Sequence, residues 1–196
     1  PMTPVEIANI GLVALRQHPI ASFEEDSADA RTVSALFFTA ARSVLQAWEW
    51  NECYADVALP AAATNTSTIF TYVCTLPADC LRVRSCPDLT GTWRVGQRNL
   101  YVNDHPPITV IYTRDLFINQ TTGVRVQGGE DVAISAPLAN AIAMQLALMM
   151  TEQLTGSAQR YGDMAVLGKQ ALTAAKVADN MEIAQVVTRE DDWVDV

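Results

Sequence analysis

The sequence has 196 residues, of which 49% are hydrophobic and 18% are charged, so a disordered chain is excluded and a globular protein is indicated. The formal net charge is −9, from 22 acidic and 13 basic residues. Proteins that bind nucleic acids neutralise phosphates with clustered lysines and arginines, and the sequence has no such cluster. Specific binding of DNA or RNA is therefore not expected, although an acidic channel would let a duplex slide without sticking.

Neither secretion nor membrane insertion is expected. The first residues lack the basic start, apolar core and small-residue cleavage site of a signal peptide. The longest apolar run, Leu138–Met150, is interrupted by Asn140 and Gln145 and is shorter than the about 20 residues of a transmembrane helix. We interpret it as a buried helix.

Two helices are predicted at the start of the chain. Thr3-Pro4-Val5-Glu6 has the form of a capping box, and the helix that it starts should end near Gln17, before Pro19. A second helix, capped by Asp26 or Ser27, should reach about Trp48. Its apolar residues recur at steps of three and four, which indicates packing in a core: Ala30, Val33, Phe37, Ala41, Val44 and Trp48.

The middle of the chain changes to the pattern of a small antiparallel sheet or partial barrel. A small-residue, threonine-rich loop, 61–67, precedes a series of short β-prone runs with turns between them. The predicted strands are 69–76, 81–84, 93–95, 100–102 and 108–112. The third and fourth should form a hairpin through Gly96-Gln97-Arg98-Asn99.

Helical periodicity returns at Ser135, which can cap a helix with Pro137 in its first turn. Gly156 should end this helix, and Ser157 should cap a fourth one that fades near Met181.

The predicted fold class is α+β. Two helices from each end of the chain form a four-helix bundle, an antiparallel β-rich insertion separates the second from the third helix, and an extended tail follows. The corresponding segments are 1–52, 53–133, 134–181 and 182–196. One bundle core should contain Leu12, Phe37, Val44, Leu138, Ile142, Leu146 and Leu172.

No motif for catalysis, metal binding or cofactor binding is present. Cys80, His105 and Asp104 lie in the same β region and are the one imaginable nucleophilic set, yet no local signature supports them. The four cysteines form no CxxC pair, and the histidines have no zinc spacing, so we expect free thiols packed as small hydrophobic groups. The sequence predicts no enzyme, no metal and no cofactor, with a small hydrolase as a remote alternative.

The stretch from Tyr72 to Val83, YVCTLPADCLRV, resembles the Y-x-x-x-LP-x-DCLRV stretch of the tail tubular protein A family, the adaptors of short-tailed phages. Other features of that family follow in the same order. They are an acidic loop before the second helix, Trp48-Glu49-Trp50 at its end, the Trp93 to Tyr101 hairpin, an Ile111-Tyr112 strand, and two alanine-rich helices around Thr155-Gly156-Ser157. The resemblance covers about residues 4–181.

This resemblance implies a virion structural protein at the head–tail junction, assembled in the cytoplasm of the host bacterium. A portal-matched ring of about twelve copies would extend the DNA channel, help retain the genome, and connect the portal to the next tail or nozzle protein. Genomic DNA would pass without specific binding, and the free chain should be largely monomeric. Another neck or tail component, such as a tail terminator, remains the main alternative.

The polar tail after residue 181 ends with Trp193, Val194 and Val196 among acidic residues. A solitary tryptophan there either packs back on its own domain or anchors a partner. Family members grip the portal with a C-terminal extension, so the resemblance favours Trp193, Val194 and Val196 as portal-binding residues.

Overall fold

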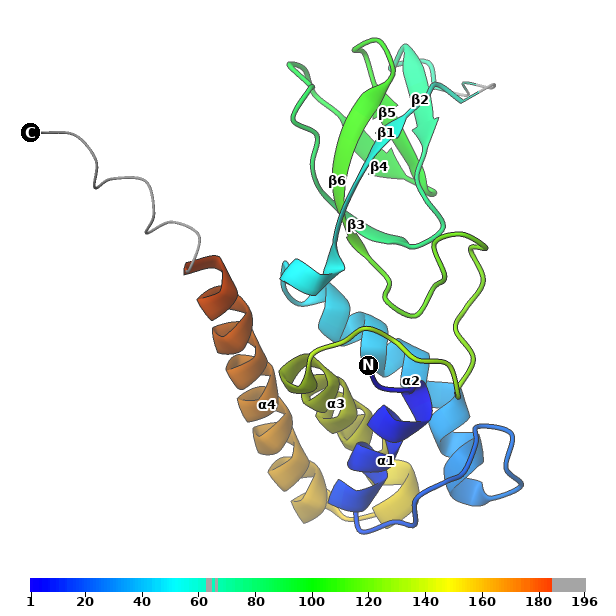
Figure 1. Cartoon of the computed structure of the whole chain (residues 1–196), viewed down its shortest axis with the longest axis vertical. Coiled ribbons are helices and arrows are strands. Elements are labelled where there is room, and N and C mark those ends of the chain that lie inside the picture. Colours follow the sequence, from blue (N-terminus) through cyan, green and yellow to red (C-terminus); the bar gives the residue numbers. More distant parts are fainter. Residues whose placement is uncertain (63–64, 66, 185–196) are drawn as a thin grey trace, which may run out of the picture. The chain divides into compact units, whose positions relative to one another are not determined.

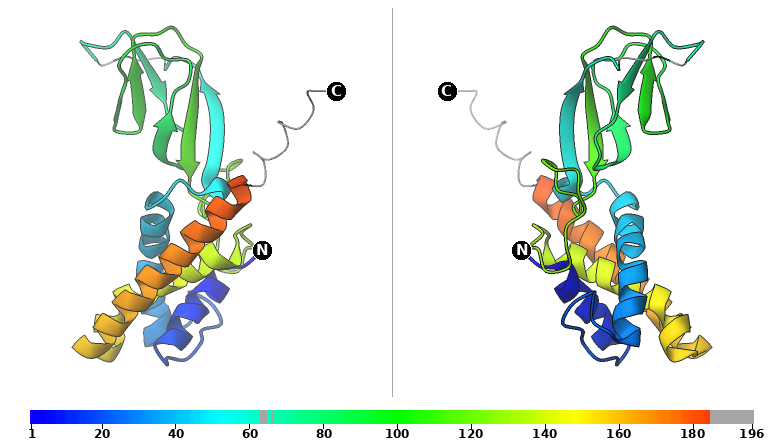
Figure 2. Two further views of the ribbon diagram at one scale, coloured as in Figure 1. Left: turned by 90° about the vertical axis from the view of Figure 1, so that its left-hand side faces the viewer. Right: turned by 90° about the vertical axis from the view of Figure 1, so that its right-hand side faces the viewer.

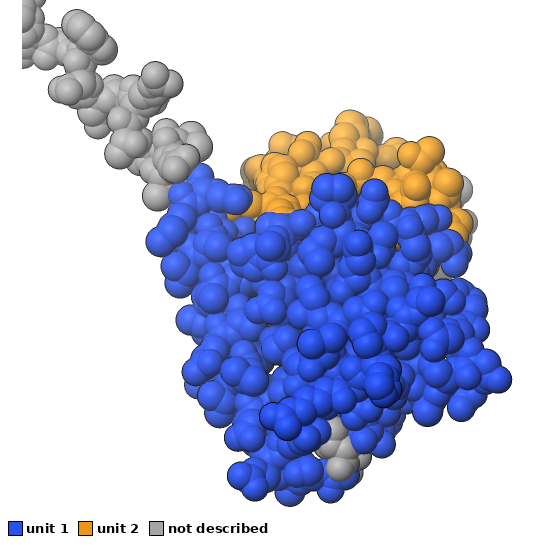
Figure 3. Space-filling model, turned by 60° about the horizontal axis from the view of Figure 1, so that its bottom comes forward, with its two compact units in different colours: residues 1–44, 127–196 blue, residues 45–126 orange. Residues whose placement is uncertain are grey.

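The structure is a computed structural model that describes residues 1–62, 65 and 67–184 (Figure 1). Within these residues the protein is α+β, with four α-helices, a short 3-10 helix and two small antiparallel sheets. The chain divides into a helical unit, Pro1–Val44 with Gln127–Val196, and a β unit, Leu45–Val126 (Figure 3). Each unit has its own core and is described separately below.

The first helix of the helical unit, α1 (Pro4–Ala14), begins with the predicted capping box. The Thr3 hydroxyl accepts a hydrogen bond from the Glu6 amide (3.1 Å), and the Glu6 carboxylate accepts one from the Thr3 amide (2.7 Å). The helix ends three residues before the predicted Gln17, because Arg16 adopts a left-handed φ of 60°. The Gln17 amide then donates to the Leu12 carbonyl, which closes a Schellman motif without glycine.

The other helices are α2 (Ala28–Gln46), α3 (Ala136–Thr155) and α4 (Ala158–Ala184). The Ser27 hydroxyl caps α2 by accepting from the Ala30 amide (3.1 Å), as predicted. Gly156, at a φ of 58°, separates α3 from α4, which continues to Ala184 and not only to Met181.

Helix α3 lies between α1 and α4 and packs against both (Figure 1, Figure 2). At the contact with α1, a Cβ added to Gly11 would lie 2.7 Å from the Ala143 carbonyl oxygen. The absence of a side chain at Gly11 therefore sets how closely α1 and α3 approach. The Arg160 guanidinium, in the first turn of α4, donates to the Leu15 carbonyl at the end of α1 (3.2 Å).

Six of the seven predicted core residues are buried in the helical unit: Leu12, Phe37, Val44, Leu138, Ile142 and Leu146. The seventh prediction, Leu172, is wrong, because this side chain is only half-buried. Helix α4 buries Met164, Ala171 and Ala175 instead. One residue rotates the side-chain direction by about 100°, so Leu172 lies at the border of the buried face that Ala171 occupies.

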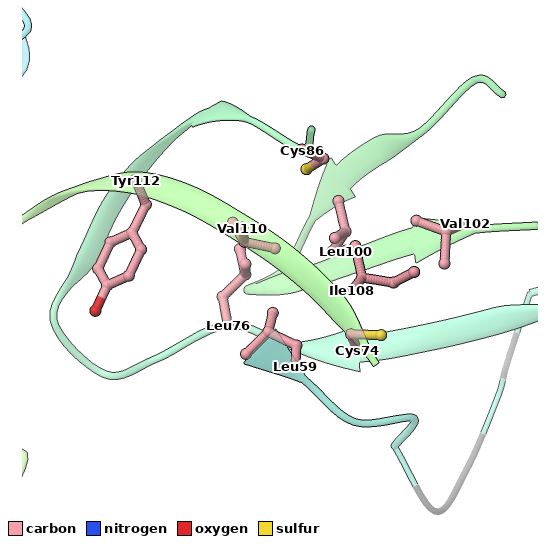
Figure 4. Packing of buried hydrophobic residues seen from close by; sticks show 9 residues of the cluster. All are labelled: Leu59, Cys74, Leu76, Cys86, Leu100, Val102, Ile108, Val110 and Tyr112. Carbon is pink, nitrogen blue, oxygen red and sulfur yellow. The ribbon is translucent and has the colours of Figure 1, made fainter. Parts of the chain in front are cut away.

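The β unit contains two three-stranded antiparallel sheets, in the orders β1-β6-β3 and β2-β5-β4. The strands are β1 (Tyr54–Leu59), β2 (Tyr72–Thr75), β3 (Cys80–Ser85), β4 (Arg94–Gly96), β5 (Asn99–Val102) and β6 (Ile108–Arg114). The short helix η1 (Asn51–Cys53) precedes β1. Side chains from both sheets meet in one hydrophobic core (Figure 4), formed by Leu59, Cys74, Leu76, Cys86, Leu100, Val102, Ile108, Val110 and Tyr112.

Two features of the β unit differ from the sequence prediction. Strand β1 was not predicted, because its Ala55 and Asp56 are poor strand formers and β1 is held by its pairing along β6. The predicted four-residue hairpin connection is a two-residue turn, because β4 extends to Gly96 and β5 starts at Asn99. Its residues Gln97 and Arg98 both have left-handed φ values, 49° and 64°.

Candidate interaction surfaces

Two residues of the LPADCLRV stretch, Leu76 and Asp79, are buried in the β unit, whereas Ala78 and Arg82 are exposed. The buried Asp79 carboxylate accepts hydrogen bonds from the Tyr112 hydroxyl (3.2 Å) and from the Gln120 side-chain amide (3.3 Å), while its carbonyl accepts from the Asp115 amide (2.7 Å). Desolvation and the nearby Asp79 charge raise the pKa of Tyr112 to about 12, so this phenol stays protonated and remains a donor at neutral pH.

The arginines around this stretch also serve the β unit. The Arg84 guanidinium donates to the Trp50 carbonyl (2.6 Å) and to the Thr113 hydroxyl (2.9 Å), which ties β3 to the segment before η1 and to β6. Arg98, in the hairpin turn, donates to the Pro77 carbonyl (2.5 Å), and its own carbonyl accepts from the Leu76 amide (2.9 Å). The polar groups of the LPADCLRV stretch are thus used within the chain, and their role is structural.

The structure does not bring together Cys80, His105 and Asp104, the candidate nucleophilic set from the sequence. Cys80 pairs with Arg114 at one end of β6, whereas His105 precedes Ile108 at the other end. Six strand residues at about 3.3 Å each separate these ends by about 20 Å. The Asp104 carboxylate accepts from the Thr90 hydroxyl (3.1 Å), and the His105 Nδ1 lies 2.6 Å from the Pro106 carbonyl oxygen.

The cysteines are poor nucleophiles. All four are free, and Cys53, Cys74 and Cys86 are buried, as the sequence predicted, while Cys80 is half-buried. Burial is the main cause that raises the pKa of the Cys53 thiol to about 12 and that of Cys80 to about 11. Burial also raises the pKa values of Cys74 and Cys86. Since the thiolate is the reactive form, little of it exists near neutral pH.

We expect slow labelling of the native thiols by a maleimide-type or disulfide reagent at pH 8, with Cys80 reacting first because it is the most accessible. Its rate should keep rising with pH up to about 11, because the raised pKa means that the thiolate forms only there. Labelling with and without denaturant, with Cys80→Ala as the control, measures this. Fast reaction of a thiol other than Cys80 in the native protein would contradict the structure.

The outward face of α4 is exposed and carries apolar side chains among exposed polar ones, including Gln170 and Thr173. It carries Val166 (57% exposed), Leu167 (46%), Val177 (49%) and Met181 (66%), with the exposed Ala174 among them. Steps of four and seven residues align Val166, Val177 and Met181 on one stripe, opposite the face that packs on α3. Lys169 and Lys176, the two lysines of the sequence, lie along one side of this stripe. We call it the α4 stripe.

A second exposed surface lies on α1. Met2, Glu6, Asn9, Ile10 and Val13 line a shallow open groove, in which Val13 is 58% exposed. Glu130 and Asp131 are exposed and directly precede Val132, whose backbone pairs with Met2, so further acidic residues border the groove. We call it the α1 groove.

A third surface lies in the β unit, beside the hairpin of β4 and β5. Ser67, Ile69, Phe70, Arg94, Gly96, Gln97 and Tyr101 line a groove, in which the rings of Phe70 and Tyr101 lie 6.1 Å apart. Ile69 is 78% exposed at its edge. Strand β4 lies at the edge of its sheet, which leaves this groove accessible.

Comparison with protein-family models and with curated proteins finds no match for this chain. Within the residues that the structure describes, no group of three or more histidine, cysteine, aspartate or glutamate side chains is placed to hold a metal ion. No helix in that same part of the chain is both long enough and apolar enough to cross a membrane.

The sequence-predicted portal-binding residues Trp193, Val194 and Val196 lie outside the described residues. The α4 stripe and the α1 groove were not predicted. The sequence contains no clear signal for the first, because apolar and polar residues are mixed around the circumference of α4 and no single buried face stands out.

Proposed function

We propose that this chain is a virion structural protein, the head–tail adaptor of a tailed phage. It would form a ring under the portal, extend the DNA channel and connect to the next tail protein, without catalytic activity. The observation that carries the proposal is the order of the family-like motifs along the chain, from the acidic loop before α2 to the break at Gly156.

We further propose that the four helices form one bundle from which the β unit is inserted. Each of them contributes fully buried or nearly buried apolar side chains to the helical unit, including Leu12 from α1, Phe37 from α2, Ile142 from α3 and Met164 from α4. A protein of this organisation has two units that can serve two neighbours. The groove beside the β4–β5 hairpin would suit one of them, because the half-buried Phe70 and Tyr101 and the exposed Ile69 line it together with Arg94.

The acidic balance of the chain fits a DNA channel. With a net charge of −9, the lumen of an assembled ring would repel phosphates and let the genome pass without being held. Tight duplex binding by the assembled ring in a filter-binding assay at low salt would count against this part of the proposal.

Mixing the purified chain with its cognate portal tests the function directly. Light scattering should report about one chain mass for the chain alone and a large complex after portal is added, and electron microscopy should show a ring on the portal. Failure of the chain to bind any portal of a matching phage would contradict the proposed function.

We predict that Trp193→Ala weakens portal binding by at least about tenfold, because a large aromatic anchor is typical of an interface hot spot. The melting temperature should barely change if this residue serves the partner and not the core. Trp93→Ala, which removes a partly exposed tryptophan of the β unit, is the matched control. Equal losses of stability and of portal binding would indicate that Trp193 packs in the core. Unchanged portal binding would indicate that other residues bind the portal.

A further inference from the structure

Strand β4 is an open edge of its sheet, and its backbone offers free hydrogen-bonding groups there. The two-residue turn makes Gly96 and Asn99 a hydrogen-bonded pair. In an antiparallel ladder the next pair, Val95 with Leu100, is therefore not hydrogen-bonded. The Val95 amide and carbonyl point away from β5, and no hydrogen bond from a described residue reaches them. Such an edge is a template for one further strand.

The side chains of β4 define what an added strand would meet. Arg94 and Gly96 lie on the face that carries the groove beside the hairpin, next to Tyr101. A Cβ added to Gly96 would lie 3.7 Å from the Tyr101 ring, so Gly96 leaves space beside an aromatic surface. Val95 points to the other face, where its side chain is 42% exposed. The added strand thus needs side chains that suit a cation, an apolar residue and a glycine, in that order.

The charge of the groove favours an acidic side chain opposite Arg94. Arg94 is exposed, and no ion pair or hydrogen bond with a described residue uses its guanidinium. Arg98 adds positive charge at the turn. The Asp104 carboxylate lies beyond β5, at the end of the β4–β5 pair away from the turn, and accepts a hydrogen bond from the Thr90 hydroxyl. Opposite charges across two strands stabilise their pairing.

Residues 193–196, Trp-Val-Asp-Val, have the side chains that this edge requires. In an antiparallel register that pairs Val194 with Val95, two apolar side chains lie opposite each other. The same register sets the Asp195 carboxylate opposite the Arg94 guanidinium. Apolar and charged positions of the segment therefore match those of β4 in one register.

This register also gives the large ring of Trp193 a place in the groove. Trp193 lies opposite Gly96, whose missing side chain leaves room for an indole ring beside Tyr101. Phe70 lines the same groove, with its ring 6.1 Å from that of Tyr101. An aromatic side chain opposite an edge glycine is a known device that stabilises strand pairing.

We infer that residues 193–196 add to β4 as an antiparallel strand, with Trp193 in the groove beside the hairpin. The occupant of the edge is thus the C-terminal segment of the same chain. Residues 185–192 separate it from the end of α4 and span up to about 28 Å when extended, so docking does not require α4 to lie against β4. The role of the contact rests on the proposed function, because it would hold Trp193 on the β unit until a portal takes its place.

Amide hydrogen exchange of the full chain, followed by NMR, measures the contact at Val95. This amide should exchange at least about threefold more slowly in the wild type than in Asp195→Arg, because it is bonded only while the segment is docked. Arg94→Glu should have the same effect, and Arg94→Glu with Asp195→Arg should restore slow exchange, since the ion pair is then reversed. Asp191→Arg, the same charge reversal outside the register, is the matched control.

The amide of residue 94 faces β5, so it should stay protected in every variant and reports that the hairpin is folded. Exchange of the wild-type Val95 amide at the rate of an unprotected peptide would overturn the inference. Slow exchange that Asp195→Arg leaves unchanged would mean that another segment occupies the edge. Slow exchange that depends on chain concentration would mean that a second copy occupies it, and either result overturns the inference.

Engineered cysteine pairs test the register. In the antiparallel register residues 94 and 195 form a non-hydrogen-bonded pair with Cα atoms about 4.5 Å apart, which suits a disulfide. Arg94→Cys with Asp195→Cys should cross-link at least tenfold faster under oxidised glutathione than Arg94→Cys with Asp192→Cys. A parallel strand could set residue 192 opposite residue 94, with Trp193 on the face away from the groove. Faster cross-linking of residue 192 would therefore contradict the inference.

Portal binding separates this inference from the proposed function. A chain that binds portal, but has an unprotected Val95 amide and no 94–195 cross-link, overturns the inference and leaves the proposed function standing. A chain with the protected amide and the cross-link that binds no portal supports the inference and contradicts the proposed function.

Discussion

Replacement of Leu146 by alanine should lower the free energy of unfolding of the helical unit by about 2–5 kcal/mol. Leu146 lies in the middle of α3, the helix that packs against both α1 and α4, and its side chain is fully buried. Truncation removes buried apolar surface and leaves a cavity that the neighbouring helices can fill only in part. Thermal or urea unfolding followed by circular dichroism measures the loss.

Leu167→Ala is the matched control, because Leu167 is 46% exposed on α4 and the same atoms are removed there. Its effect on unfolding should stay within about 0.5 kcal/mol. An unchanged melting temperature for Leu146→Ala would show that α3 does not pack in the core as described. The chain divides into two compact units, so the helical signal should be followed by itself.

Gly11→Ala should destabilise the helical unit by about 1–3 kcal/mol, although alanine is the better helix former. The new Cβ would lie 2.7 Å from the Ala143 carbonyl oxygen, which is backbone and cannot rotate away. Helices α1 and α3 must then separate, and the buried side chains between them lose contact. Chemical denaturation of the variant measures the change.

Gly162→Ala provides the opposite expectation in the same unit. A Cβ at Gly162, in α4, would meet nothing within 4 Å, so only helix propensity acts and a gain of up to about 1 kcal/mol is expected. Loss of stability in both variants would show a general intolerance of substitution. Stabilisation by Gly11→Ala would mean that α1 and α3 are farther apart than in this structure.

The sequence by itself determined most of the local structure, because the groups that fix it are neighbours in the chain. The capping box of Thr3 and Glu6 needs residues three positions apart, and Ser27 caps α2 within one turn. The break between the last two helices needs the left-handed conformation of Gly156, which glycine adopts without strain. Apolar periodicity likewise identified Phe37 as a core residue, and the apolar run Leu138–Met150 identified Ile142 and Leu146.

Contacts between residues that are distant in the sequence determined the features that the sequence pattern did not predict. Strand β1 contains alanine and aspartate and exists through its partner β6, which lies more than 40 residues away. The two-residue turn at Gln97 and Arg98 holds left-handed conformations without glycine, and Arg98 is bonded there to Leu76 and Pro77. The LPADCLRV stretch carried the resemblance, but the use of Asp79 and Arg84 inside the β unit depends on residues distant in the sequence.

Tertiary packing likewise determines which face of α4 is exposed. Apolar and polar residues are mixed around this helix, so its sequence does not distinguish the side that packs on α3 from the side that stays exposed. The small side chains of Ala171 and Ala175 allow the close approach, and they, not Leu172, are buried there. The sequence thus determined that α4 is a helix, whereas packing on α3 decided that Val177 and Met181 remain exposed.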